Sequence, residues 1–253
     1  MIGFKDFEFD LPRALLHSLV QEFEGVQPAP LTATAVAEVP ETQGVYQLFK
    51  DGQLVYIGKT DADSGLNRRL TRHAQKILFR QALSPEQVSF KAIRVYVFTA
   101  MDLETDLIRH FGGVASLAWN GSGFGSNDPG RERDTTRVKD SNFDALYPID
   151  IDREITWTGP DGGPVSVVLG ALKEHLPYTL RFEGARGRSR QPHPDLAVAE
   201  MPAFAGPVTV RSLMAGVVSV LPSGWQATAL LGYVILYKER WDYPQGAVIA
   251  RAP

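Results

Sequence analysis

The chain has 253 residues and an ordinary globular composition, with 44% hydrophobic and 22% charged side chains. A chain of this length can bury a core without covalent staples and forms one or two domains. The sequence contains no cysteine. Disulfides, cysteine-ligated zinc, iron–sulfur clusters and a cysteine nucleophile are therefore excluded. Any metal site must use carboxylate, amide or imidazole ligands.

The net charge of −3 is unevenly distributed along the sequence. Residues 1–40 carry a net charge of −4, residues 41–140 a net +2 and residues 141–253 a net −1. Within the middle segment, residues 68–94 hold seven cations and a single acid. A local patch of this kind can bind phosphate groups whatever the total charge of the protein.

The sequence predicts neither a signal peptide nor a membrane span. The N-terminus carries early acids and no apolar run, unlike a signal peptide. The uncharged segment Ser212–Tyr237 is interrupted by Pro222-Ser223-Gly224, so its pieces are too short to cross a bilayer. We expect this segment to lie in the core and the protein to be cytoplasmic.

Hydrophobic periodicity predicts an α+β fold. A strand-like start and an amphipathic helix are expected over Phe4–Phe23, followed by a Pro- and Ala-rich linker over Gln27–Pro40. The expected elements that follow are, in order, two strands, a helix, a strand and a helix: Gly44–Phe49, Gln53–Lys59, Leu66–Phe79, Ser89–Thr99 and Leu103–Phe111. Asp102 is expected to cap the last helix, and a long Gly-, Asn- and Pro-rich loop follows it.

The last hundred residues are less regular, and they could form a second lobe or an extension of the first. A helix is expected over Leu169–His175 and a basic loop over Arg181–Arg190. The strand-like segments are Pro164–Val168, Val208–Val210, Val217–Leu221 and Leu230–Tyr237.

Two tyrosines lie ten residues apart on the first expected hairpin, in the segments Gly44-Val45-Tyr46 and Val55-Tyr56-Ile57-Gly58. Tyrosine is a favoured strand residue, so packing alone could explain both. A two-residue Asp51-Gly52 loop would pair Tyr46 with Ile57 and point the tyrosines to opposite faces. We predict instead a three-residue loop, Lys50-Asp51-Gly52, which places Tyr46 opposite Tyr56 with both phenols over one site.

The expected helix over Leu66–Phe79 has two distinct faces. The apolar face is formed by Leu66, Leu70, Ala74, Ile77 and Leu78. The opposite, basic stripe is formed by Arg69, Arg72, His73, Lys76 and Arg80. No acids are interleaved to form ion pairs along this stripe. The pattern therefore indicates either a solvated surface or a surface that binds a polyanion.

Glu104 stands at the edge of an apolar stripe on the next expected helix, with Ile108 and Phe111 following at i+4 and i+7. The helix dipole favours an acid in the first turn, which is a sufficient structural explanation. The functional interpretation is a single carboxylate ligand for a divalent cation.

The order of these segments resembles the GIY-YIG nuclease superfamily. The matching segments are GVY, VYIGKT, RLTRH, a helical glutamate and WN, within residues 41–140. The resemblance implies a small central antiparallel β-sheet flanked by helices. Val45 replaces the isoleucine of the first motif. The spacing from YIG to the arginine is longer than is typical of the family, so Arg68 is a rival to Arg69.

The resemblance also implies which residues surround the scissile phosphate. The implied catalytic residues are Tyr46, Tyr56, Lys59, Arg69, His73 and Asn120, with Glu104 as the metal ligand. In this interpretation Tyr46 is the base or positions water, with Lys59, His73 or Tyr56 as its support. Arg69 stabilises the developing charge, Asn120 orients groups in the site, and one Mg²⁺ or Mn²⁺ ion is expected.

The segment WNGSGFGSNDPGRERD resembles the corresponding region of GIY-YIG type II restriction endonucleases. This branch implies site-specific hydrolysis of double-stranded DNA to 5′-phosphate and 3′-hydroxyl ends by a homodimer. The expected DNA contacts are Arg72, Lys76, Arg94, Arg131, Arg133, Arg186 and Arg188, with Arg181 and Arg190 in the same basic loop as the last two.

The expected organisation is an N-terminal arm and linker (1–40), a nuclease core (41–150) and a C-terminal extension for DNA recognition or dimerisation (151–253). No nucleotide cofactor is expected, because the Gly121–Gly125 loop lacks a following Gly-Lys. The commonest restriction-nuclease core is excluded because the chain contains no Glu-x-Lys. A repair- or homing-type GIY-YIG nuclease and a non-catalytic DNA-binding module remain as alternatives.

Overall fold

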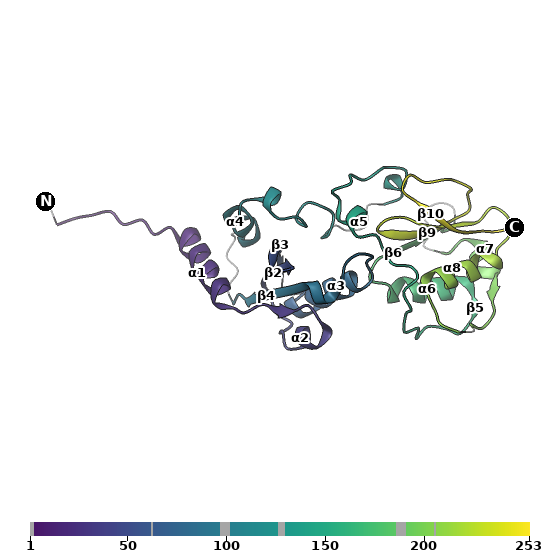
Figure 1. Ribbon diagram of the computed structural model, residues 1–253, viewed down its shortest axis with the longest axis horizontal. Helices are drawn as coiled ribbons and strands as arrows, with labels where there is room; N and C mark the ends of the chain where they lie inside the picture. Colours follow the sequence, from purple (N-terminus) through teal and green to yellow (C-terminus); the bar gives the residue numbers. More distant parts are fainter. Residues whose placement is uncertain (1–2, 62, 97–101, 126–129, 186–190, 205) are drawn as a thin grey trace. The chain divides into compact units, whose positions relative to one another are not determined.

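The computed structural model describes residues 3–61, 63–96, 102–125, 130–185, 191–204 and 206–253. Its helices and strands, labelled in Figure 1, form an α+β fold, which confirms the predicted fold class. The chain divides into two compact units. Unit 1 comprises Met1–Ala74 and Ser84–Gly125, and unit 2 comprises Gln75–Leu83 and Ser126–Pro253. Residues 41–150, the expected core, are thus distributed over both units.

Unit 1 is built around a four-stranded antiparallel sheet in the order β1-β4-β2-β3. Its strands are β1 (Ala29–Pro30), β2 (Gly44–Lys50), β3 (Gln53–Thr60) and β4 (Val88–Arg94). Its helices and 3₁₀ turns are α1 (Leu11–Gly25), α2 (Ala33–Ala37), α3 (Leu66–Leu78), η1 (Pro85–Gln87), α4 (Leu103–His110) and η2 (Val114–Ser116). Helix α3 belongs to unit 1 as far as Ala74 and to unit 2 from Gln75.

The two faces of this sheet have different partners, because successive strand residues point to opposite sides. On one face, Val45 and Ile57 share an apolar cluster with residues of α1 and α4, including Phe23, Leu103 and Leu107. The other face carries the two motif tyrosines, which contact His73 of α3. The fold therefore separates an apolar face from a face that carries the two tyrosines and His73.

The prediction of a linker over Gln27–Pro40 is wrong. Strand β1 lies within this segment and pairs with Ser89 and Phe90 of β4. Helix α2 lies there too, capped by the Thr32 hydroxyl, which accepts a hydrogen bond from the Ala35 N–H, and its Val36 is fully buried. Short elements with small side chains lack the periodicity that longer helices show.

The predicted basic stripe on α3 does not form one solvated surface. Arg72 is exposed, whereas His73 and Arg80 are buried, at 4% and 5% of full exposure. The Arg80 guanidinium is in unit 2, where it donates hydrogen bonds to the Asp144 carboxylate at 2.7 Å and the Tyr147 carbonyl at 2.9 Å. Helical spacing predicted that the five residues share one face. It could not show that Tyr46 binds His73 and that Asp144 binds Arg80 inside the protein.

Unit 2 contains a four-stranded sheet in the order β10-β8-β9-β6 and a two-stranded sheet of β5 and β7. Its strands are β5 (Gly163–Pro164), β6 (Thr179–Phe182), β7 (Glu200–Met201), β8 (Gln226–Ala229), β9 (Tyr233–Tyr237) and β10 (Ala247–Arg251). Its helices and 3₁₀ turn, apart from the end of α3, are η3 (Arg131–Arg133), α5 (Phe143–Leu146), α6 (Val165–His175), α7 (Pro194–Val198) and α8 (Val210–Ser219). Strands β6 and β9 are parallel and the other pairs are antiparallel.

The core of unit 2 joins α6 and α8 to the larger sheet. The strands predicted over Val208–Val210 and Val217–Leu221 are wrong, because Val210–Ser219 forms α8. The strand predicted over Pro164–Val168 is also wrong, because α6 begins at Val165. Valine favours strands only weakly, and burial on a helix overrides that preference here.

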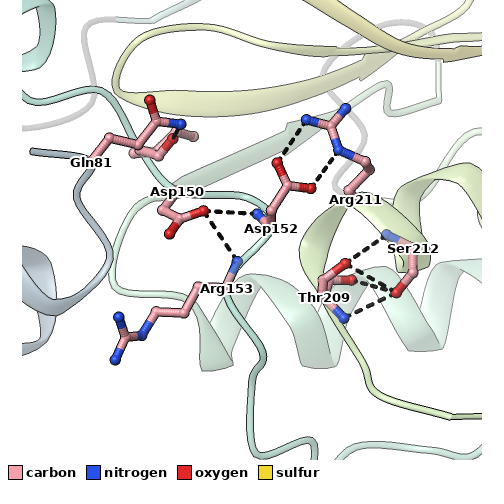
Figure 2. Close-up of polar contacts among 8 residues, drawn as sticks. Gln81, Asp150, Asp152, Arg153, Thr209, Arg211 and Ser212 are labelled. Atoms are coloured by element: carbon pink, nitrogen blue, oxygen red, sulfur yellow. Dashed lines mark hydrogen bonds and ion pairs between the residues drawn. The ribbon is translucent and has the colours of Figure 1, made fainter.

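A capping box and an ion pair fix the start of α8, as Figure 2 shows. The Thr209 hydroxyl accepts a hydrogen bond from the Ser212 N–H, and the Ser212 hydroxyl accepts one from the Thr209 N–H, both at 3.0 Å. Arg211 donates two hydrogen bonds to the Asp152 carboxylate, at 2.5 and 2.9 Å. Residues 150–153 are thereby attached to the first turn of α8 (Figure 2).

A buried carboxylate anchors the segment after η3 to the sheet of unit 2. Asp134 is 2% exposed and accepts hydrogen bonds from Arg181, from the Tyr233 hydroxyl at 2.7 Å and from the Tyr237 hydroxyl at 3.2 Å. The predicted basic loop over Arg181–Arg190 is therefore wrong at its start, because Arg181 lies on β6 and takes part in this network. Arg131 stacks on Tyr237 at 4.1 Å and forms ion pairs with two glutamates.

Among the described residues, no helix combines the length and apolar character needed to cross a membrane. The apolar segment Ser212–Tyr237 instead forms most of α8 and strands β8 and β9.

We expect Asp134→Ala to destabilise unit 2 strongly, because the substitution removes the carboxylate that the largely buried Arg181 guanidinium and two tyrosine hydroxyls share. Breaking a buried ion pair costs about 3–5 kcal/mol. Chemical denaturation followed by fluorescence measures the change. Asp140→Ala is the matched control, since Asp140 is exposed and such surface changes stay within about 0.5 kcal/mol. Equal stability of the two variants would contradict this account of the network.

Candidate active site

The β2–β3 hairpin places both motif tyrosines on one face, but by a register other than the predicted one. Asp51 and Gly52 both have positive φ, at 49° and 80°, and form a two-residue loop. The prediction of a three-residue loop with Tyr46 opposite Tyr56 is therefore wrong. A β-bulge inserts Val55 into β3, so that Tyr46 pairs with Gly58 and Tyr56 with Leu48. The tyrosines are thus diagonal neighbours, with ring centroids 6.0 Å apart.

Three glycines of the motif segments are explained by close approach. A Cβ atom on Gly58 would lie 2.5 Å from the Tyr46 hydroxyl, and one on Gly125 would lie 2.7 Å from the Tyr56 hydroxyl. A Cβ atom on Gly44 would lie 2.3 Å from the Ile93 carbonyl oxygen. Any side chain at Gly58 would therefore displace the Tyr46 ring.

Tyr46 is fully buried, and its hydroxyl is the centre of a polar network. The hydroxyl oxygen lies 2.8 Å from His73 Nε2 and also forms hydrogen bonds with Arg69 and Tyr56. Burial raises the pKa of Tyr46 far above that of a free phenol, and the neighbouring Tyr56 raises it further. Tyr46 is therefore a neutral phenol at neutral pH, with an imidazole as its immediate proton partner.

Tyr56 lies between this buried network and the acid on α4. Its ring is 5.7 Å from the His73 ring, and its hydroxyl forms hydrogen bonds with Tyr46 and Arg69. Burial raises the pKa of Tyr56, and the negative charge of Glu104 adds to this effect. Of the two phenols, Tyr56 is the one with Glu104 as an electrostatic neighbour.

The structure distinguishes the two rival arginines. Arg69 donates hydrogen bonds to both tyrosines. Its Nε is buried and has no hydrogen-bond partner among the described residues. Arg68 is exposed and donates to the Asp63 carbonyl at 3.4 Å. Arg69 is therefore the guanidinium of the site, and its Nε–H can still donate a hydrogen bond to a ligand.

Glu104 has the properties of an oxygen ligand for a hard cation. Its carboxylate is half-buried and forms no hydrogen bond or ion pair with any described residue. Burial raises its pKa, whereas the charges of Lys59 and Arg69 lower it. Mg²⁺ is commonly held by one or two carboxylates together with water and substrate phosphates, which fits this donor set. No group of three or more His, Asp or Glu side chains gathers as a metal site in the described part of the chain.

Lys59 does not support Tyr46. Its Nζ donates to Asp102 at 2.7 Å, and the Thr105 hydroxyl donates to the other Asp102 oxygen at 2.6 Å. These hydrogen bonds lower the pKa of Asp102 to about 2, and the Asp102 partner raises the pKa of Lys59. Asp102 occupies the cap position of α4 as predicted, but its side chain makes no capping hydrogen bond.

Asn120 acts on the backbone of β3 rather than on the tyrosine hydroxyls. Its side-chain oxygen accepts a hydrogen bond from the Ile57 N–H at 2.9 Å, and its amide donates to the Ile57 carbonyl at 3.0 Å. The neighbouring Trp119 N–H donates to the carbonyl of the bulged Val55 at 2.9 Å. These three hydrogen bonds hold the outer edge of β3 on both sides of Tyr56.

Sequence reasoning missed Phe124. This residue lies in the loop that was expected to be irregular, yet it is 1% exposed. Its ring stacks on His73 with centroids 4.7 Å apart and meets the Tyr56 ring edge-on at 5.1 Å. The sequence signal that could have indicated a buried position is a large aromatic residue flanked by Gly123 and Gly125.

The predicted DNA-binding residues differ in their surroundings. Arg72 and Arg133 are exposed, and Arg94 is exposed with its guanidinium over the Tyr96 ring at 4.3 Å. Lys76 lies 5.4 Å from the centroid of the Phe143 ring, within unit 2. Arg186 and Arg188, like Arg190, lie outside the described residues.

Comparison of the sequence with protein-family models and with curated proteins found no match.

Gly58→Ala is expected to lower the free energy of unfolding by about 1–3 kcal/mol, the usual cost of inserting a methyl group into a packed region. The added Cβ would collide with the Tyr46 ring. Gly25→Ala is the control in the same unit, because a Cβ there meets no atom within 4 Å. Thermal denaturation of both variants measures the difference. A Gly58→Ala protein as stable as wild type would mean that Tyr46 does not lie across Gly58.

Proposed function

We propose that this protein is a site-specific, metal-dependent DNA endonuclease of the GIY-YIG type, most like a type II restriction enzyme. The observation that carries the proposal is the convergence of residues far apart in sequence. Tyr46, Tyr56 and His73 lie within 6.0 Å of one another by ring centroids, and Arg69 forms hydrogen bonds with both tyrosines. Glu104 acts electrostatically on Tyr56 from a separate helix.

The chemistry of this cluster suits hydrolysis of a phosphodiester. The reaction forms a bond from water oxygen to phosphorus, breaks the bond from phosphorus to O3′ and leaves a 5′-phosphate. Negative charge grows on the nonbridging oxygens in the transition state. Arg69 supplies fixed, partly desolvated donors for that charge, including its unpartnered Nε–H. Arginine suits this role because its planar donors match phosphate oxygens.

The proton that water loses passes to the His73 imidazole, because both phenols already carry their own protons. We assign contact with the attacking water to Tyr56, since Tyr46 has no exposed surface and Tyr56 is the neighbour of Glu104. The contact between the Tyr56 and Tyr46 hydroxyls, and the 2.8 Å hydrogen bond between the Tyr46 hydroxyl and His73 Nε2, connect the position of the water to the imidazole. Tyr46 is then a relay rather than the base that the resemblance implied. The departing O3′ takes up a proton from solvent.

Glu104 is the residue that would hold a Mg²⁺ or Mn²⁺ ion. Such an ion supplies Lewis-acid stabilisation of the phosphate charge when it is bound. Lys59 and its partner Asp102 lie close enough to modulate the charge of Glu104. Asn120 holds the Tyr56 segment in place through the β3 backbone.

The proposed substrate is double-stranded DNA, and a homodimer would meet its two strands equivalently. We assign phosphate contacts to Arg72, Arg94 and Arg133, which are exposed. The proposal includes a cytoplasmic location. The alternatives are a repair- or homing-type GIY-YIG nuclease, which would nick DNA without strict site specificity, and a non-catalytic DNA-binding module.

We expect wild-type protein with Mg²⁺ to cut plasmid DNA into discrete fragments, and Glu104→Ala to lose this activity by about a thousandfold, since a Lewis acid contributes several kcal/mol. The matched control is Asp106→Ala, which removes an acid from the same helix turn. Asp106 pairs with Arg109 at 3.0 Å. Gel analysis measures the rates, and sequencing of the fragment ends gives the site, the stagger and the end chemistry.

Three outcomes would redirect this assignment. Non-specific nicking would favour the repair-type alternative. Binding of DNA without cleavage on diverse substrates would favour the non-catalytic module. Equal loss of activity in Glu104→Ala and Asp106→Ala would remove the special role of Glu104.

Arg69→Met is expected to lower the cleavage rate by about 10²–10³-fold, the usual effect of removing one preorganised donor. Arg68→Met removes the same charge one residue earlier and should change the rate little, because Arg68 does not contact the tyrosines. Single-turnover cleavage assays at saturating enzyme separate this effect from DNA affinity. A larger loss in Arg68→Met than in Arg69→Met would show that the wrong arginine has been assigned.

A further inference from the structure

Phe124 packs against two members of the tyrosine–histidine network in unit 1, the rings of His73 and Tyr56. Its ring lies nearly parallel to the His73 ring, with an interplanar angle of 20° and a centroid distance of 4.7 Å. The same ring meets Tyr56 at 71°, and Trp119 packs against it at 4.8 Å. Phe124 therefore contacts the imidazole and one phenol at the same time.

The backbone before Phe124 is held by hydrogen bonds, and the residue after it packs closely against Tyr56. On one side, Asn120 and Trp119 are bound to β3, and the Ser122 hydroxyl donates to the Trp119 carbonyl at 2.9 Å. On the other side, Gly125 approaches the Tyr56 hydroxyl so closely that a Cβ atom would lie 2.7 Å away. Gly123 has a φ of 98°, which turns the chain sharply just before Phe124. The loop thus holds the Phe124 ring against His73 and Tyr56.

We propose that Phe124 is a positioning residue, which holds the His73 imidazole in the ring orientation that keeps Nε2 directed at the Tyr46 hydroxyl. This inference rests on the proposed function, because it gives the imidazole its place in the proton path from Tyr56 through Tyr46.

The physical basis is the torsional freedom of the histidine ring about χ2. The χ2 torsion of histidine has broad wells, so hydrogen bonding and packing together set the ring plane. A face-on aromatic neighbour restricts that torsion, because rotation of the imidazole would drive its edge into the phenyl ring. The 2.8 Å contact between Tyr46 and His73 depends on this ring plane. An aliphatic side chain at position 124 would fill much of the space without imposing a plane.

The test compares Phe124→Leu, which removes the ring, with Phe124→Tyr, which keeps it. In steady-state cleavage of plasmid DNA with Mg²⁺, we expect Phe124→Leu to lower kcat by about tenfold and leave KM for DNA unchanged, since small misplacements of reacting groups act on the chemical step. Phe124→Tyr should restore kcat. Phe90→Leu is the matched control, because Phe90 is a buried phenylalanine of the same unit and is not among the described residues whose rings contact His73.

A second measurement does not require cleavage. Hydrogen–deuterium exchange at the imidazole Cε1, read by mass spectrometry, reports the solvent contact of each histidine. The other four histidines of the chain, at positions 17, 110, 175 and 193, serve as internal references. We expect exchange at His73 to be several-fold faster in Phe124→Leu than in wild type, Phe124→Tyr and Phe90→Leu, with the four references unchanged.

The two measurements separate the possible failures. If wild-type protein cuts no DNA, the proposed function fails, while the exchange rate of His73 still decides the role of Phe124. If kcat and His73 exchange in Phe124→Leu match wild type, the positioning role is overturned. A Phe124→Leu protein that fails to fold leaves Phe124→Tyr as the decisive variant. Fast His73 exchange in a folded Phe124→Tyr protein then also overturns the role, and wild-type exchange supports it.

Discussion

The candidate site depends on one feature of the β2–β3 hairpin, the extra residue at Val55. Side chains alternate along a strand, so a shift of one residue moves a whole set to the other face. With the observed two-residue loop and no bulge, Tyr46 and Tyr56 would point in opposite directions. The bulge restores the shared face but leaves the Val55 carbonyl outside the ladder, and the Trp119 N–H takes it up. The loop that carries Phe124 is thereby coupled to the register of the motif strands.

Burial then determines the protonation state of the cluster. Two phenols with raised pKa values stay neutral beside a guanidinium, so the cluster has one fixed positive charge and no negative charge of its own. The nearby Glu104 supplies the negative charge at the outer side. Such an arrangement favours an incoming anion near Arg69 and a cation near Glu104. A phosphodiester accompanied by a divalent cation provides both.

The sequence predicted features that depend on a pattern within one short segment, and it failed for features that depend on contacts between distant segments. The helices α3 and α4 and the strands β2 and β3 were predicted because long periodic segments are reliable. The shared face of Tyr46 and Tyr56 was predicted for a wrong reason, since no local pattern shows the bulge at Val55. The choice of Arg69 over Arg68 followed from the RLTRH segment, which begins at Arg69, and its geometry agrees. Phe124 could not be assigned, because its partners His73 and Tyr56 are more than fifty positions away in sequence.

The basic residues show the limit of counting charges along a sequence. A cation contributes to phosphate binding only if its charge is not already compensated, because ion pairs inside the protein must be broken first. Arg80 and Arg181 are bound by the carboxylates of Asp144 and Asp134, and Arg131 is bound by Glu183 and Glu239. None of these three is an unpaired phosphate ligand, although a count of charges in the sequence includes them in the same way as the exposed Arg72. The net charge of +2 for residues 41–140 is therefore a poorer measure of the capacity to bind phosphate than the number and position of the exposed guanidiniums. Electrostatic attraction of any polyanion depends on where such exposed groups are, rather than on the charge of a protein as a whole.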